Sequence, residues 1–259
     1  RITLKMTEPT TPTWLYPRWI AHRGSGKLAP ENTMAAFRLG AQSGWKMFEC
    51  DVKLSQDGIP FLLHDATLER TTNGQGIAGN LPWSALSQLD AGGWHSPQYA
   101  GETLPTLANV AQFCLANGYF LDLEIKPTPG MEVITGKVVA EHAARLWAKA
   151  ATPPFLTSFQ QDALAAAQQA APHLPRGLLV DVWSDDCLEH AQRLQCAALV
   201  CNQNIWNAER IRTVKKLGMH CISYTVTTEE KLTELLALDA EHGIVSDCIG
   251  SWDAKARAE

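Results

Sequence analysis

Carboxylate side chains at the ends of two apolar segments are the first candidates for chemistry. Glu49 and Asp51 lie two residues apart in one segment, and Glu124 and Lys126 close another. Residues two apart in a β-strand face the same side, so the members of each pair are expected to share a face. Three carboxylates brought together would repel one another unless a cation lay among them. Oxygen ligands suit Mg2+ or Ca2+, so the pattern predicts one such cation; an ion pair of Glu124 with Lys126 alone is the alternative.

Two histidines are candidates for acid–base chemistry, because imidazole titrates near neutral pH and can both take and give a proton. His22 ends the apolar segment 19–22. Asp57-Gly58 is a two-residue hairpin signal, and pairing around it places residue 64 opposite residue 51. His64 is therefore expected beside Asp51, although a slip of one residue would turn it to the other face.

Cationic side chains follow the same segments. Arg23 and Lys126 suit an anionic phosphoryl oxygen. Glu31 and Asn32 have two interpretations, as site residues or as scaffold, because Asn32 is a good N-cap for a helix that starts at Thr33. Two histidines, strand-end acids, an arginine and a lysine together favour a catalytic interpretation over isolated structural groups.

Short apolar segments that alternate with amphipathic stretches must position these residues. The candidate strands are residues 19–22, 47–52, 120–125, 155–158, 177–181, 198–202, 221–226 and 243–247. The candidate helices include residues 33–43, 136–150, 161–171, 186–194, 208–217 and 228–238. Such alternation implies a parallel sheet, because the chain must return through a crossover before each new strand. Eight units in a chain of this length predict an α/β fold, the (β/α)8 TIM barrel; an open doubly wound sheet is the alternative.

The longest gap between candidate strands lies between the second and the third, and it predicts an insertion at about residues 66–102. This stretch is rich in glycine and too rich in turns to be one helix. In a barrel, an insertion after a strand lies at the C-terminal face, over the active-site mouth. The insertion is interpreted either as a lid or rim that contacts the substrate, or as a segment that packs only on itself. We expect a flexible leader at residues 1–17 and a single catalytic barrel domain at residues 18–253.

Composition narrows the function classes. The chain has 259 residues, with 22 Lys and Arg against 27 Asp and Glu, a net charge of -5. Nucleic acid is not expected as a partner, because the surface that binds it is normally basic. No apolar run is long enough to cross a bilayer. The 7 cysteines are odd in number and show no metal-binding spacing, which predicts reduced thiols and a cytoplasmic location. Nothing in the sequence marks an oligomer interface.

An ordered set of short motifs resembles the glycerophosphodiester phosphodiesterase family, and the layout is similar to its short bacterial cytosolic members. The motifs are Ala21-His22-Arg23-Gly24, Pro30-Glu31-Asn32-Thr33, Glu49-Cys50-Asp51, Asp57-Gly58, His64-Asp65, Leu68-Glu69-Arg70-Thr71-Thr72 and Glu124-Ile125-Lys126. The second half is similar more loosely, through Ser158-Phe159, Asn202, Tyr224-Thr225-Val226 and Ser246-Asp247. Tyr224 and Ser25 depart from a tryptophan and a glycine typical of the family, and these departures concern substrate fit.

The resemblance implies a TIM barrel with a small insertion after the second strand, and metal-dependent hydrolysis of glycerophosphodiesters. The substrates would be compounds such as glycerophosphocholine and glycerophosphoethanolamine, cleaved to glycerol 3-phosphate and an alcohol. By position, the metal ligands would be Glu49, Asp51 and Glu124. The acid–base pair would be His22 and His64, and the phosphate-binding side chains Arg23 and Lys126. A non-catalytic barrel that binds a phosphorylated metabolite and a phospholipase-type phosphodiesterase on the same barrel are the alternatives.

Overall fold

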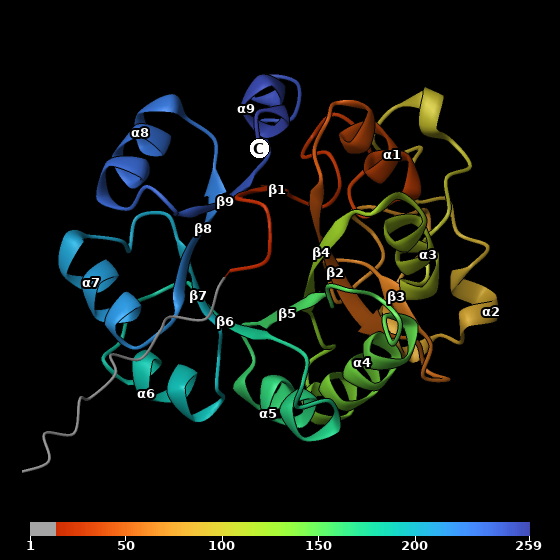
Figure 1. Cartoon of the computed structure of the whole chain (residues 1–259). Helices are drawn as coiled ribbons and strands as arrows, with labels where there is room; N and C mark the ends of the chain where they lie inside the picture. Colours follow the sequence, from red (N-terminus) through yellow and green to blue (C-terminus); the bar gives the residue numbers. More distant parts are fainter. Residues whose placement is uncertain (1–13) are drawn as a thin grey trace, which may run out of the picture.

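The computed structural model describes residues 14–259, and a closed barrel of eight parallel strands forms its centre (Figure 1). The barrel strands are β1 (Trp19–Ala21), β2 (Met47–Leu54), β4 (Phe120–Ile125), β5 (Phe155–Ser158), β6 (Arg176–Val180), β7 (Ala198–Asn202), β8 (His220–Val226) and β9 (Gly243–Ser246). β1 pairs with both β9 and β2, which closes the sheet. The predicted TIM barrel is confirmed, and the open doubly wound sheet is excluded.

Helices between the strands surround the barrel (Figure 1). They are α1 (Met34–Gln42), α3 (Leu107–Asn117), α4 (Glu132–Leu146), α5 (Gln161–Ala170), α6 (Asp186–Arg193), α7 (Ala208–Lys216) and α8 (Glu229–Leu238), and α9 (Asp253–Arg257) follows β9. α3 adds a helix to the predicted set. Side-chain oxygens of Thr33, Thr106, Asn207 and Thr228 accept hydrogen bonds from the first turns of α1, α3, α7 and α8. Local N-caps therefore set where these helices begin.

Two apolar layers hold the barrel together. Met47 belongs to the cluster that fills the barrel interior, whereas Phe48 and Val52 belong to the cluster between strands and helices. Because both faces of the strands are buried, the strands are nearly continuous apolar runs, and a polar residue that faces inward is conspicuous. Glu49 and Asp51 lie on the face opposite to Phe48 and Val52, as the alternation predicts.

The hairpin between β2 and β3 (Pro60–Leu62) has a register that differs by one residue from the predicted one. Val52 pairs with Leu62, whereas the predicted register paired it with residue 63. The turn takes residues 56–58, because the backbones of residues 55 and 59 pair across it and Gly58 adopts a left-handed φ of 80°. β3 ends at Leu62, so strand alternation no longer controls where His64 points.

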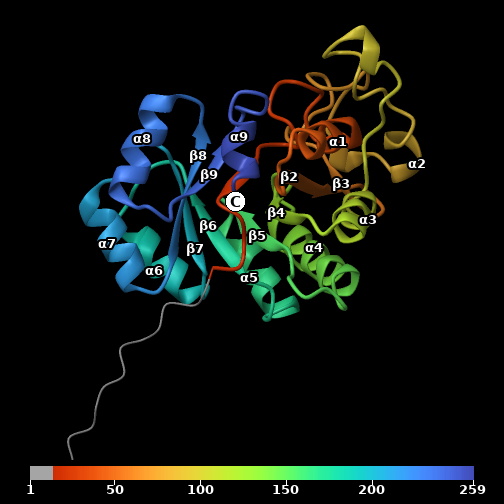
Figure 2. The same cartoon turned by 45° about the horizontal axis from the view of Figure 1, so that its top comes forward.

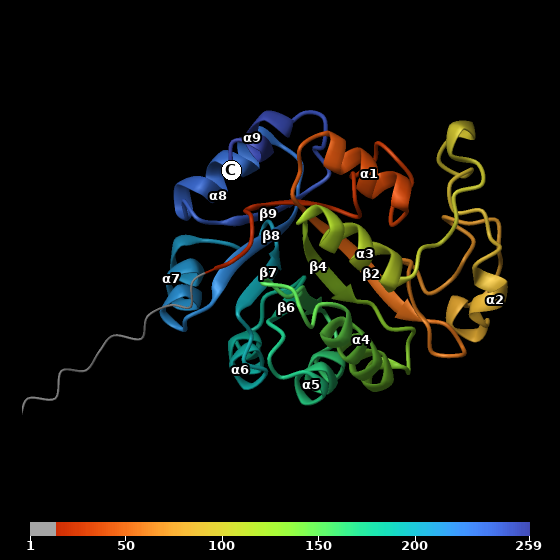
Figure 3. The same ribbon diagram turned by 45° about the vertical axis from the view of Figure 1, so that its right-hand side comes forward.

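The insertion (residues 66–102) lies to one side of the barrel, beside α1 and α3 (Figures 2 and 3). Its helical elements are the short η1 (Ala78–Asn80), α2 (Trp83–Leu86) and η2 (Pro97–Tyr99). Leu68 and Leu86 belong to an apolar cluster of its own, which Phe61 of β3 joins. His95 Nε2 lies 2.9 Å from the backbone oxygen of Lys27, in the loop after β1. The insertion thus packs on itself and also contacts a loop at the mouth of the barrel.

Aromatic side chains close the end of the barrel where the strands begin. Tyr16 packs against Phe155, and its hydroxyl donates to the backbone oxygen of Pro153 at 2.9 Å. Trp14 stacks on His220 with the ring centres 4.4 Å apart. Of the predicted leader at residues 1–17, residues 1–13 lie outside the described part of the chain. Within residues 14–259, no helix combines the length and the apolar character needed to span a membrane.

Candidate active site

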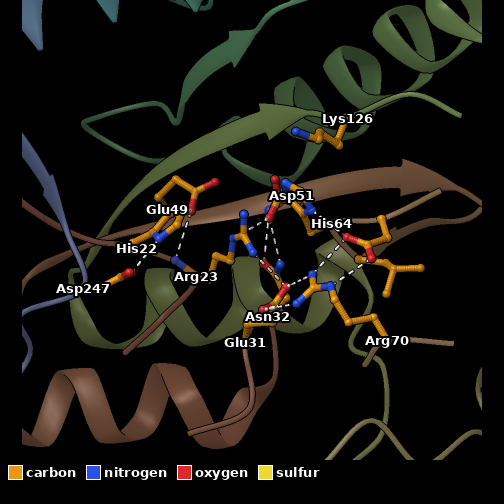
Figure 4. A network of polar contacts seen from close by, with 12 residues as sticks. His22, Arg23, Glu31, Asn32, Glu49, Asp51, His64, Arg70, Lys126 and Asp247 are labelled. Carbon is orange, nitrogen blue, oxygen red and sulfur yellow. Dashed lines mark hydrogen bonds and ion pairs between the residues drawn. The ribbon is translucent and has the colours of Figure 1, made fainter. Parts of the chain in front are cut away.

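Buried carboxylates from two neighbouring strands meet at the end of the barrel where the strands terminate (Glu49 and Asp51 in Figure 4). β2 and β4 pair in parallel with Asp51 level with Glu124, so the alternation that turns Glu49 and Asp51 inward brings Glu124 beside them. One oxygen from each of the three side chains lies within 4.8 Å of the others. The structure therefore brings together all three acids predicted as metal ligands.

Burial and mutual repulsion oppose the simultaneous ionisation of these acids. Burial, together with the charges of Asp51 and Glu124, raises the pKa of Glu49 well above its ordinary value. Burial and the charge of Asp51 likewise raise the pKa of Glu124 to about 8. Without an added cation, burial and repulsion therefore favour the protonated forms of Glu49 and Glu124 more than they would for an exposed glutamate.

Asp51 is the acid that the protein itself stabilises as an anion. Burial opposes its ionisation, but Arg23, His64 and Lys126 outweigh that effect and lower the pKa of Asp51 to about 2. The side-chain amide of Asn32 adds a hydrogen bond to Asp51 Oδ2 at 2.8 Å. One carboxylate of the cluster is thus a fixed negative charge in a buried place.

The donor set fits a divalent cation. Three carboxylates offer only oxygen ligands, the kind that Mg2+ and Ca2+ prefer. A divalent cation would bring the positive charge that the raised pKa values of Glu49 and Glu124 show to be missing. Lys126 Nζ lies 3.1 Å from Glu124 Oε1, so the ion pair considered as an alternative is present, but it engages one of the three acids.

His22 follows β1 and lies between two carboxylates. Its Nδ1 is 2.6 Å from Asp247 Oδ1, and its Nε2 is 3.9 Å from Glu49 Oε2 (Figure 4). With the Nδ1 hydrogen directed to Asp247, Nε2 carries the lone pair and faces the acid cluster. Asp247 follows β9 and is a site residue that sequence reasoning misses, although the signal that found Glu49, an acid at a strand end, applies to it too.

His64 lines the same cavity as His22, a cavity of about 250 Å³. Its Nδ1 is 2.8 Å from Asp65 Oδ1, so Nε2 is the nitrogen available to a ligand. Burial lowers the pKa of His64, and the charge of Asp51 opposes that shift. The predicted pairing with Asp51 is wrong, because the Leu63 backbone donates to the Asp51 backbone oxygen instead, at 3.1 Å. His64 reaches the cavity because β3 has already ended.

Arg23 and Asn32 hold left-handed backbone conformations, with φ of 53° and 58°. Such values are uncommon for residues other than glycine, although asparagine adopts them more readily than most, and they cluster at functional sites. Arg23 Nε lies 3.4 Å from Asp51 Oδ2, and Asn32 Oδ1 accepts from the Asp51 backbone at 3.1 Å. The interpretation of Asn32 as an N-cap is wrong, because Thr33 caps α1 and Asn32 binds Asp51.

Two lysines near the cluster differ in their surroundings. Lys126 lines the cavity, and its Nζ lies 5.3 Å from the ring centre of Phe159. Lys53 is 1% exposed, and its Nζ donates to the backbone oxygens of residues 63, 64 and 126 at 2.7, 3.2 and 3.2 Å. It joins the segment that carries His64 to the one that carries Lys126. Sequence reasoning missed Lys53, although it shares the face of β2 on which Asp51 lies.

The cavity has a polar side and an apolar side. The apolar side consists of Phe159, Leu179, Val200, Tyr224 and Val245. An anionic group can bind among the cationic side chains of the polar side while a less polar part of the ligand contacts the opposite wall. Imidazoles and a carboxylate cluster beside such an anion suit hydrolysis of a phosphate ester.

Comparison with known proteins places the chain among phosphodiesterases. The sequence model of the "Glycerophosphoryl diester phosphodiesterase family" matches residues 22–251. A Caldanaerobacter subterraneus subsp. tengcongensis protein named glycerophosphodiester phosphodiesterase is 31% identical over 232 residues, which cover 88% of this chain and 93% of that protein. A Bacillus subtilis protein of the same name is 28% identical, with 84% of this chain and 79% of that protein covered.

Solved structures agree in fold. An Oleispira antarctica phosphodiesterase, determined in complex with the product sn-glycerol-3-phosphate, has a TM-score of 0.85 and 33% identity, covering 94% of this chain and 98% of that one. A glycerophosphodiester phosphodiesterase from Agrobacterium tumefaciens has a TM-score of 0.76 and 25% identity, covering 92% of this chain and 99% of that one. The chain therefore belongs to the glycerophosphoryl diester phosphodiesterase family and is an enzyme of the phosphodiesterase class.

Proposed function

We propose that the chain hydrolyses glycerophosphodiesters, such as glycerophosphocholine and glycerophosphoethanolamine, to glycerol 3-phosphate and an alcohol. One observation chiefly supports the proposal: His22 and His64 line a single cavity with Glu49 and Glu124, and each has a carboxylate against its Nδ1. The sn-glycerol-3-phosphate bound by the Oleispira antarctica neighbour supports the identity of the product.

Substrate binding depends on the charges of the polar side. Arg23 and Lys126 contact the phosphate oxygens, because both are cations that line the cavity. Glu49, Asp51 and Glu124 hold one divalent cation, Mg2+ or Ca2+, which when bound neutralises negative charge on the phosphoryl group. The apolar side contacts the remainder of the substrate.

The two histidines move protons in opposite directions. One Nε2 takes the proton of the attacking hydroxyl, and the other gives a proton to the departing alcohol oxygen as its bond to phosphorus breaks. The attacking hydroxyl belongs to water or to the substrate's own glycerol; the second route forms a cyclic phosphate, which water then opens. Asp247 and Asp65 orient the rings and stabilise the imidazolium form. Each proton transfer contributes about 10²–10⁴-fold.

Release of glycerol 3-phosphate from glycerophosphocholine tests the proposal. We expect release that EDTA abolishes and that added Mg2+ or Ca2+ restores, with glycerophosphoethanolamine as a second substrate. Failure to release product from several head groups with either metal would contradict hydrolysis and support a barrel that only binds a phosphorylated metabolite. Cleavage confined to acylated phospholipids would instead support the phospholipase-type alternative.

We also propose a reducing, cytoplasmic setting. All seven cysteines, which fall within the described residues, are free thiols, and six of them are buried. Oxidising compartments favour paired cysteines. Thiol titration of the unfolded protein, isolated from its own cells without reductant, should find every cysteine free. A disulfide in that preparation would contradict the proposed setting.

A further inference from the structure

Arg70, in the insertion, joins two carboxylates that lie behind different parts of the site (Figure 4). Its Nε and one terminal nitrogen donate to the two oxygens of Asp65, at 2.8 and 2.9 Å. Its two terminal nitrogens donate to the two oxygens of Glu31, at 2.9 and 2.8 Å. A single planar guanidinium thus makes a bidentate pair with each carboxylate, which the point charge of a lysine cannot do.

Each of these carboxylates also contacts a residue of the cavity. Asp65 Oδ1 lies 2.8 Å from His64 Nδ1, and Glu31 Oε1 accepts from Arg23 at 2.9 Å. These are the same two oxygens that share one terminal nitrogen of Arg70. A continuous polar connection therefore runs from His64 through the insertion to Arg23 in the loop after β1.

The geometry of Arg70 sets it apart from an ordinary surface ion pair. Isolated exposed pairs contribute little, whereas bidentate pairs joined in a network contribute more. The Arg70 side chain is 44% exposed and that of Glu31 is 13% exposed, so a partly exposed cation binds an acid that is largely buried. Hydrogen bonds from Arg70 lower the pKa of Asp65, which keeps this carboxylate anionic. Without the guanidinium, Asp65 and Glu31 would face each other as two anions and would separate.

We propose that Arg70 is a positioning residue that aligns His64 through Asp65 and Arg23 through Glu31. When the insertion packs against the barrel, Arg70 therefore also sets the positions of His64 and Arg23. The inference rests on the proposed function, because it assumes that His64 transfers a proton and that Arg23 binds the phosphate. It gives the insertion a part in the reaction without any contact between Arg70 and the substrate.

The contact of Arg70 with Asp65 and its contact with Glu31 lead to separable kinetic effects. Arg70→Ala is expected to lower kcat for glycerophosphocholine at least about tenfold through misplacement of His64, and to raise KM about threefold or more through Arg23. In an Asp65→Asn background, Arg70→Ala should no longer lower kcat, although it should still raise KM. In a Glu31→Gln background it should no longer raise KM. If Arg70 only stabilised the fold, the effects on kcat and on KM would not disappear separately in the two backgrounds.

Two further measurements separate the shape of the guanidinium from its charge. Arg70→Lys keeps the positive charge but lacks the planar guanidinium that binds two oxygens at once. Its kcat should therefore be nearly as low as that of Arg70→Ala. Millimolar guanidinium should increase the activity of Arg70→Ala several-fold, whereas sodium chloride of equal ionic strength should not. Full rescue by lysine, or equal rescue by both salts, would overturn the positioning role.

Glu69→Ala is the matched control in the insertion. Its carboxylate accepts from the Gly76 backbone at 2.7 Å, so the variant loosens the insertion without removing a carboxylate bound to Arg70. Its kcat and KM should stay within about twofold of the wild type. Wild-type kinetics in Arg70→Ala, or equal losses in all three backgrounds, would overturn the inference.

His64→Ala separates failure of this inference from failure of the proposed function. Activity that survives in His64→Ala would contradict the proton-transfer role itself, whatever Arg70→Ala does. An inactive His64→Ala beside a fully active Arg70→Ala would leave the proposed function standing and overturn only the role of Arg70. If Arg70→Ala does not fold, Arg70→Lys supplies the same comparison.

Discussion

The end of the barrel where the strands terminate buries three carboxylates within 4.8 Å of one another, whereas the end where they begin is closed by aromatic rings, among them Tyr16 and Phe155. Both ends hold half-buried histidines. His22 and His64 have a carboxylate against Nδ1, while burial lowers the pKa of His220 at the other end to about 4. Burial is the largest cause of the shift at His220, whereas at the opposite end a carboxylate against Nδ1 holds each imidazole in the orientation that proton transfer needs.

Glu49→Gln is expected to have the largest effect on activity at the end of the barrel that holds the acids. Loss of one proposed metal ligand is expected to lower kcat/KM for glycerophosphocholine by about a thousandfold or more, which corresponds to several kcal/mol. The free energy of unfolding in EDTA should not fall, because the substitution removes a buried acid that the charges of Asp51 and Glu124 repel. Wild-type activity, or unchanged Mg2+ and Ca2+ binding by calorimetry, would remove Glu49 from the ligand set.

Asp239→Asn is the matched variant at the opposite end. Asp239 is buried and accepts from Lys215 Nζ at 2.7 Å. The loss of this pair should lower the free energy of unfolding and leave kcat/KM within about twofold, because the residue lies away from the cavity. A large loss of activity in Asp239→Asn would contradict the functional separation of the two ends.

Replacement of the histidines gives the next largest effect. His22→Ala and His64→Ala should each lower kcat at least about 100-fold with the fold intact, because each removes one proton transfer. His220→Phe keeps the stacking on Trp14 and should leave kcat within about twofold. Steady-state kinetics and circular dichroism of the three variants check this. Near-normal rates in both alanine variants would refute the acid–base assignment.

Two buried cations allow a comparison of stability with activity. Lys53 donates to three backbone oxygens near the site, and Arg176 donates to those of residues 172, 174 and 194 at the other end. Lys53→Met and Arg176→Met should each lower the free energy of unfolding by about 3 kcal/mol, because buried carbonyl groups lose a charged donor. Urea unfolding measures this loss.

Activity distinguishes the two variants. Lys53→Met should also lower kcat, since the segments that carry His64 and Lys126 lose their connection, whereas Arg176→Met should not. Assays are best made well below the unfolding temperature of both variants. Equal kcat in the two variants would show that the Lys53 contacts stabilise the barrel without positioning the site.

The pH dependence of stability gives the smallest effect. The folded chain keeps His220 neutral down to about pH 4, whereas the unfolded chain protonates it near 6.5. The unfolded state therefore binds more protons between these values, and the free energy of unfolding falls as pH decreases. His220→Phe should remove about 2 kcal/mol of that fall, measured by urea unfolding across the window. An unchanged slope would contradict the buried neutral state.

Sequence reasoning found the residues whose position depends on local periodicity. Alternation along β2 placed Glu49 and Asp51 on one face, and the parallel register with β4 brought Glu124 to them. It failed where a local rule met a competing contact. Asn32 binds Asp51 instead of capping α1, and the hairpin turn takes one residue more than Asp57-Gly58 alone predicts.

Sequence reasoning did not identify which groups contact the cavity residues from behind. Asp247 meets His22 from the other end of the chain, and Arg70 meets Glu31 across the boundary between insertion and barrel. Nothing in the sequence distinguishes Lys53 from other lysines in strands; its three backbone carbonyl partners are known only from the structure. Acids and bases are common along any chain, and only folding decides which of them become neighbours.

By itself the sequence determined the barrel and the inward-facing acids of its strands, because strand periodicity acts over a few residues and the alternation of elements can be followed along the chain. Only the tertiary structure decided which carboxylate faces each imidazole, which amide binds Asp51, and how the insertion reaches the site through Arg70. Those contacts join distant segments, and their directions depend on closure of the barrel, which places the ends of all its strands on one rim.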